Sequence, residues 1–182
     1  EYNAAGALSL IREAAQAGVK VLALPELCLT GYTCGDLFLQ TALLKGAEAA
    51  LEGLLRETAA MDLLFAVGLP VRAEGKLFNC AAVCCRGRLL GLVPKRSLPN
   101  YGEFYEQRWF VPGETEVKPL HFAGQETRFG AGLLFSCAQF PALTVGVELC
   151  EDLWAPAPPS TALALAGATV ILNLSASDEL AA

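Results

Sequence analysis

The segment TVGVELCEDLW, residues 144–154, holds the junction that decides how this chain is interpreted. Its first six residues are rich in strand-forming side chains and predict a short buried strand over 144–149. The strand ends at Cys150, which two carboxylates and a tryptophan follow. A thiol in this place has three interpretations: an apolar filler of the core, a metal ligand or a nucleophile.

The segments on either side predict an α/β fold. The expected helices are 4–17, with Asn3 as cap and Gly18 as stop, 41–60 and 160–166; the expected strands are 19–24, 63–69, 77–85, 89–93, 133–135, 144–149 and 169–174. Strand, helix, strand is the pattern of a parallel crossover, and 77–93 predicts a hairpin around Arg86-Gly87-Arg88, followed by an irregular segment over 94–116. We therefore expect a mixed sheet or two sheets, with helices outside.

Composition narrows the class of protein. The chain has 182 residues, enough for one domain, and a net charge of −6, which argues against nucleic acid or an anionic membrane as partner. Seven cysteines at irregular spacings argue against a secreted disulfide framework and favour a reducing cytosol. His121 is the single histidine, so the sequence offers few ligands for a Cys/His zinc site.

Two charge-free stretches, 129–147 and 153–177, are long enough to test as membrane spans. Prolines and polar residues divide each of them into short strands, a turn and a helix, so we expect no span. No signal-peptide pattern is visible. Because the chain begins directly in a helix and stops soon after a strand, we expect it to be a piece cut from a longer polypeptide.

Three reactive side chains follow three predicted strands: Glu26, Lys95 and Cys150. Ligands gather beyond the carboxyl ends of strands in α/β sheets, so these groups can form a nucleophile, its base and an electrostatic stabiliser. Glu26 would replace the usual imidazole, because His121 lies in a predicted surface segment. Each residue also has a structural interpretation, as core filler for the thiol, turn cap for the carboxylate and solvated surface for the ammonium.

The sequence segments around these three residues resemble those of a known protein family. LALPELCLTGYTCGDLF (22–38), PKRSLPNYGEFYEQRWFVPG (94–113), GVELCEDLW (146–154) and ILNLSASDEL (171–180) resemble, in this order, the carbon–nitrogen hydrolase (nitrilase) superfamily. Within it the chain is most similar to the glutaminase domain of glutamine-dependent NAD synthetases. The resemblance covers nearly the whole chain and implies an αββα sandwich, in which two packed sheets carry helices on both outer faces.

The resemblance also implies roles for single residues. Glu26 is implied as general base, Lys95 as transition-state stabiliser and Cys150 as nucleophile. A second glutamate is implied in the loop after the lysine. Glu106 matches it best, by its spacing to a following glycine, and Glu103 is the alternative.

Four further residues are implied as contacts of glutamine: Tyr32, Glu151, Trp154 and Ser177. Two of them keep a structural interpretation as well. Trp154 can be core packing, and Ser177 can be a helix cap.

For the domain organisation, the resemblance implies that residues 1–182 form a glutaminase domain lacking one strand before Glu1 and further residues after Ala182. The chain holds no SGGxDS loop and no GxxxxGK, so the synthetase domain is absent from it. ATP and Mg²⁺ are implied for that domain and no cofactor for this one. The implied partners are glutamine, the C-terminal synthetase domain and further copies in a homo-oligomer, in the cytoplasm.

Two other functions stay open at this point. The same residues would serve a standalone amidase or nitrilase acting on another small amide or nitrile. A catalytically silent assembly domain is the second alternative, although such a domain needs none of Glu26, Lys95 and Cys150.

Overall fold

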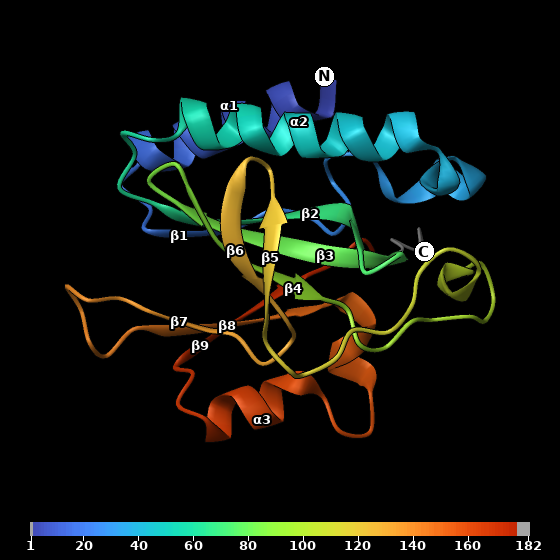
Figure 1. Ribbon diagram of the computed structural model, residues 1–182. Coiled ribbons are helices and arrows are strands. Elements are labelled where there is room, and N and C mark those ends of the chain that lie inside the picture. Colours follow the sequence, from blue (N-terminus) through green and yellow to red (C-terminus); the bar gives the residue numbers. More distant parts are fainter. Residues whose placement is uncertain (1, 178–182) are drawn as a thin grey trace, which may run out of the picture.

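Two β-sheets form the centre of the computed structural model, which describes residues 2–177 (Figure 1). The larger sheet has the order β1-β2-β3-β4-β6-β5 and the smaller one the order β7-β8-β9. The strands are β1 (Val21–Ala23), β2 (Leu64–Ala73), β3 (Lys76–Cys85), β4 (Arg88–Pro94), β5 (Lys118–Phe122), β6 (Gln125–Phe129), β7 (Leu134–Ser136), β8 (Thr144–Leu149) and β9 (Val170–Leu174). The expected α/β fold is confirmed in its form with two sheets.

The two sheets pack face to face through small and β-branched side chains. Alternate residues of β3 point to opposite faces, so Ala81 and Val83 meet Val145 and Val147 of β8 in the inter-sheet core. The alternate residues Cys80, Ala82 and Cys84 of β3 belong to a second core, which lies under α1 and α2.

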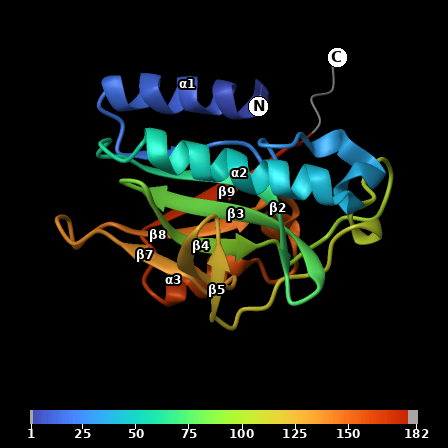
Figure 2. The same cartoon turned by 45° about the horizontal axis from the view of Figure 1, so that its top comes forward.

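Helices cover the outer faces (Figures 1 and 2). The helices α1 (Tyr2–Gln16) and α2 (Thr41–Glu57) lie over the larger sheet, and the short α3 (Pro159–Leu165) lies under the smaller one. The buried stripe of α2 has the helical spacing expected from the sequence: Leu44, Ala47, Leu51, Leu54 and Leu55. The prediction of Asn3 as a cap is wrong, because α1 already begins at Tyr2 and the Asn3 amide donates to Leu29 O instead.

The strand connections explain where prediction succeeded. The strand β1 pairs in parallel with β2, as the crossover pattern requires. Arg86 and Gly87 have φ values of 49° and 74° and close the predicted β3–β4 hairpin. The β5–β6 hairpin was not predicted; Ala123 and Gly124 close it with φ values of 51° and 70°. It lies within a segment that the sequence analysis treated only as surface.

Three 3₁₀ helices lie in the loops at one end of the sheets: η1 (Tyr32–Leu39), η2 (Glu106–Arg108) and η3 (Cys150–Trp154). Each begins at a residue that the sequence analysis singled out. The charge-free stretches divide into strands, turns and α3, as expected. Within residues 2–177, no helix combines the length and the apolar content needed to cross a membrane.

Candidate active site

Glu26 stands in the turn after β1, directly on the backbone of the larger sheet. A side-chain carbon at Gly68 of β2 would clash with the backbone of Leu27 and lie 2.6 Å from Pro25 O. Only glycine therefore lets the turn approach the sheet this closely. Leu27 adopts a left-handed φ of 50° to make the turn, and Glu26 is 1% exposed.

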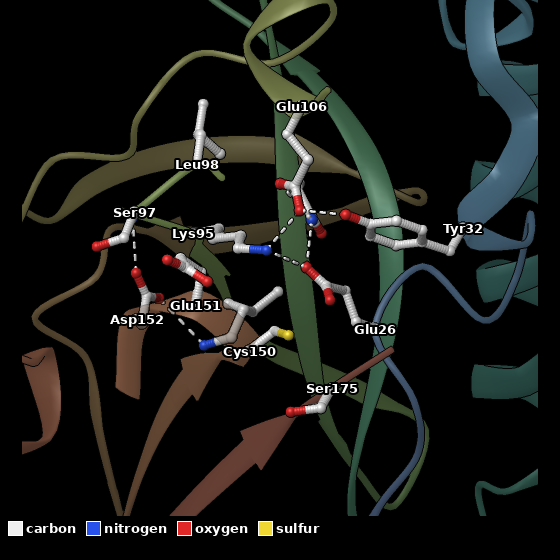
Figure 3. A network of polar contacts seen from close by, with 12 residues as sticks. Glu26, Tyr32, Lys95, Ser97, Leu98, Glu106, Cys150, Glu151, Asp152 and Ser175 are labelled. Carbon is white, nitrogen blue, oxygen red and sulfur yellow. Dashed lines mark hydrogen bonds and ion pairs between the residues drawn. The ribbon is translucent and has the colours of Figure 1, made fainter. Parts of the chain in front are cut away.

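Lys95 follows β4 and lies between two buried carboxylates (Figure 3). Its Nζ is 2.6 Å from Glu26 Oε1 and 2.6 Å from Glu106 Oε1. All three side chains are at most 2% exposed. The structure thus places Glu106, and not the exposed Glu103, beside Lys95.

Asn79 and Tyr32 complete this network. The Asn79 amide donates to Glu26 Oε1 at 2.7 Å and to Glu106 Oε2 at 3.4 Å, and the Tyr32 hydroxyl donates to Glu106 Oε1 at 2.7 Å. The sequence analysis missed Asn79. The available signal was a single amide in the otherwise apolar strand LFNCAAVCC, because a buried amide requires hydrogen-bond partners.

The charges of the network have opposite effects on its members. Burial raises the pKa of Glu26 above its ordinary value; Lys95 opposes this, whereas the charge of Glu106 adds to it. Burial acts to lower the pKa of Lys95, but Glu26 and Glu106 outweigh it and leave that pKa raised, so the ammonium stays charged. Glu26 Oε2 is buried and has no protein partner among the described residues, which leaves this oxygen able to exchange a proton.

Cys150 is the first residue of η3, immediately after the last residue of β8. Its backbone has a left-handed φ of 41°, which is strained for a residue with a side chain. Figure 3 shows the sulfur turned toward Glu26, on the same side of the sheets as Lys95. The Ser177 hydroxyl lies 3.6 Å from Sγ.

The other residues implied as glutamine contacts lie around this cysteine to different degrees. Glu151 accepts hydrogen bonds from the Tyr101 hydroxyl at 3.0 and 2.9 Å, and Tyr101 was not singled out by sequence. Trp154 is 74% exposed, so its interpretation as core packing is wrong. Ser177 follows β9 as the last described residue, and any helix that it would cap lies outside the described residues.

Cys80 and Cys84 lie in the core under the helices, and His121 lies on β5. Burial raises the pKa of Cys80 and of Cys84, which keeps both as thiols in the core. His121 points outward from β5 and contacts Glu126 on β6. Among residues 2–177, no group of three or more His, Cys, Asp and Glu side chains is arranged to hold a metal ion.

Known proteins share both the sequence and the arrangement of the strands. The chain is 43% identical to a glutamine-dependent NAD(+) synthetase of Mycobacterium tuberculosis over 96% of its own length and 26% of the relative's, and 32% identical to one of Arabidopsis thaliana over 97% and 25%. A crystal structure of a glutamine-dependent NAD(+) synthetase from Cytophaga hutchinsonii superposes with a TM-score of 0.82 at 32% identity, over 96% of this chain and 28% of that one. The chain thus spans about a quarter of the length of these relatives.

An amidase from Nesterenkonia sp. of the nitrilase superfamily shares the fold, with a TM-score of 0.63 at 24% identity over 92% of this chain and 58% of that one. The model of the carbon-nitrogen hydrolase family matches residues 1–181. The chain therefore belongs to the carbon-nitrogen hydrolase family.

Proposed function

We propose that this chain hydrolyses the side-chain amide of glutamine through a thioester on Cys150. We also propose that residues 1–182 belong to a glutaminase domain that supplies ammonia to a C-terminal synthetase domain. The observation that carries the proposal is the buried cluster of Glu26, Lys95 and Glu106 beside a cysteine at a strand end. The names of the relatives supply the choice of glutamine.

In the first half of the reaction, Glu26 takes the proton of the Cys150 thiol while sulfur attacks the amide carbon. Lys95 and the backbone N–H that follows Cys150 stabilise the negative oxygen that develops. Glu26 then gives the proton to the amide nitrogen, the carbon–nitrogen bond breaks, and ammonia leaves a thioester.

In the second half, Glu26 takes a proton from water, and the hydroxide adds to the thioester carbon. The carbon–sulfur bond breaks, the sulfur leaves as thiolate, and the proton returns from Glu26 to it. Glutamate is released, and the enzyme is restored. Glu106 has a supporting role: its contact holds the ammonium of Lys95 in place.

The binding of glutamine is assigned to the residues at the mouth of the site. Glu151 offers a carboxylate to the α-ammonium of the substrate, and Tyr101 fixes its orientation through two contacts. Tyr32, Trp154 and Ser177 are proposed as further contacts. These steps use groups that the chain itself supplies, whereas ATP and Mg²⁺ belong to the proposed synthetase domain.

The surroundings of the protein are part of the proposal. Seven free cysteines fit a reducing compartment, and we therefore place the protein in the cytoplasm. The resemblance to the family is the basis for proposing a homo-oligomer.

The test is covalent labelling with a diazoketone analogue of glutamine, followed by intact mass and peptide mapping. We expect one adduct, formed with loss of N₂, on Cys150, and protection by glutamine but not by asparagine. Cys150→Ala should remove the adduct, and the matched variant Cys85→Ala should keep it. Labelling that glutamine does not slow in the full-length protein would refute glutamine as the substrate, and labelling of another cysteine would refute the nucleophile.

A further inference from the structure

Asp152 is a buried carboxylate that the reaction steps above do not use. It is 1% exposed and lies three residues after Leu149, the buried last residue of β8. Its partners are backbone N–H groups of a distant segment and of its own turn. Arg96 N at 3.1 Å and Ser97 N at 2.7 Å donate to Oδ1, and Leu149 N at 3.1 Å donates to Oδ2. Three such donors stabilise a carboxylate in the interior.

The backbone donors to Asp152 lie next to the two reactive residues Cys150 and Lys95 in the sequence. Leu149 immediately precedes Cys150, and Arg96 immediately follows Lys95. One rigid side chain therefore connects the backbone at the sulfur to the backbone at the ammonium, across 55 residues of sequence. Figure 3 shows Asp152 between Ser97 and the turn that carries Cys150.

Apart from the exposed hydrogen bonds between Tyr101 and Glu151, the other polar contacts among the described residues hold each segment on its own side. Lys95 N donates to Asn79 O, and Gly113 N donates to Lys95 O, which ties this loop to β3. The side chain of Lys95 is drawn to Glu26 and Glu106, which lie on the larger sheet's side. Cys150 directly follows β8 of the smaller sheet and has a strained backbone. The Oδ1 contacts of Asp152 join this turn to the backbone that follows Lys95.

We propose that Asp152 is a positioning residue that holds Cys150 and Lys95 at a fixed separation across the two sheets. The inference rests on the proposed function for its kinetic consequence, because a displaced cation stabilises neither the thiolate nor the oxyanion. A simpler role exists, in which Asp152 only caps η3 through Leu149 N. The contacts of Oδ1 with Arg96 and Ser97 distinguish the two roles.

Asp152→Asn is the decisive variant because it preserves shape. An asparagine has one carbonyl oxygen, so its NH₂ must face either Leu149 N or the N–H pair of Arg96 and Ser97. Either orientation places donor against donor and breaks one side of the link. Thr58→Val serves as the matched control, since it removes another buried hydrogen bond, to Leu54 O at 2.8 Å, on α2.

The experiment uses the full-length natural polypeptide. Glutamine turnover gives kcat and KM, and the rates of iodoacetamide alkylation of Cys150 and Cys85 are mapped by mass spectrometry. For Asp152→Asn we expect kcat to fall about 10–100-fold with KM changed less than about threefold, because small displacements of reacting groups cost this much. We expect Cys150 alkylation to slow and Cys85 alkylation to stay unchanged, and Thr58→Val to alter none of these.

Three results would overturn the inference. The first is an Asp152→Asn variant with kcat and Cys150 alkylation within twofold of wild type. The second is equal acceleration at Cys85 and Cys150, which would show general loosening. The third is the same loss in Thr58→Val. If wild type alkylates at Cys150 but does not hydrolyse glutamine, the proposed function fails, and the alkylation comparison still decides the role of Asp152.

Discussion

Replacing Lys95 by methionine tests whether the buried network depends on its central cation. Lys95→Met keeps the length of the side chain and removes the charge. The carboxylates of Glu26 and Glu106 then face each other in a site that is at most 2% exposed at either side chain. The Asn79 amide still donates to both of them, but it carries no net charge.

The magnitude follows from the geometry. At 2.6 Å, and with an effective dielectric constant of about 20, each ion pair of Lys95 has a Coulomb energy of about 6 kcal/mol. The cost of removing three charged groups from water opposes this gain. Deleting one partner of a buried ion pair therefore lowers the free energy of unfolding by a net of about 3–5 kcal/mol. The same range is expected for Lys95→Met at pH 8.

The stability that Lys95→Met loses relative to the wild type should depend on pH, and the direction of this dependence can be worked out. Burial already raises the folded-state pKa of Glu26, and without the ammonium of Lys95 that pKa rises further above its unfolded value of about 4.3. A raised folded pKa gives stability that is present below the unfolded pKa and is lost as pH rises through the folded one. The deficit should therefore grow with pH, by up to about 1.4 kcal/mol per pH unit in that window.

Amide hydrogen exchange of β3 and β4 peptides measures the opening of this sheet in a protein of any length. At pH 8 the protection in Lys95→Met should fall by about two to almost four orders of magnitude. Lys118→Met is the control, because Lys118 is a surface lysine whose nearest carboxylate oxygens are 3.6 Å away, and its loss should change protection less than about threefold. Unchanged protection in Lys95→Met, or a deficit that does not vary between pH 5 and pH 8, would refute the reasoning.

Four more variants test the assignments. Cys150→Ala should reduce glutamine hydrolysis to background and leave thermal unfolding nearly unchanged; measurable turnover would disprove the nucleophile. Glu26→Gln should slow both acylation and deacylation, by about 10²–10⁴-fold in stopped-flow measurements, and rapid thioester formation in this variant would point to another base. Asn79→Ala removes a hydrogen bond that favours ionised Glu26, so the acid limb of the kcat/KM profile should move to higher pH. An unmoved limb would separate Asn79 from that ionisation. Cys85→Ala should change packing alone, and a loss of rate without a loss of thermal stability would contradict this.

The strands and helices nearest to the site could be predicted because their signals are local. An apolar run that stops at a reactive side chain marks both the strand and its end, as at Cys150 and Lys95. The hairpin of β5 and β6 carries weaker signals. Pro119 lies in its edge strand, and the polar residues of β6 resemble a loop, so the pattern of the segment did not predict strands.

Partners in the network could not be read from the sequence because they are set by tertiary distances. The spacing to a following glycine favours Glu106 over Glu103 only through the resemblance, whereas the contact with Lys95 in the structure selects Glu106 directly. Asn79 and Asp152 likewise act through segments at least 27 residues away in the chain, apart from the cap contact of Asp152. A polar residue in an apolar stretch reveals that a partner exists without revealing which one.

The glycine beneath Glu26 allows close contact between the sheet and the turn that carries this carboxylate. The backbone of Pro25 and Leu27 lies directly against Gly68, so a contact between two main chains sets the position of the turn. A side chain at position 68 would push the turn, and Glu26 with it, away from the sheet. Tyr32 and Tyr101 lie in other loops, where each makes its contact through a side-chain hydroxyl, to Glu106 and to Glu151 respectively. The position of Glu26 is therefore set by backbone, whereas Glu151, the proposed contact of the substrate ammonium, is held by the side chain of Tyr101.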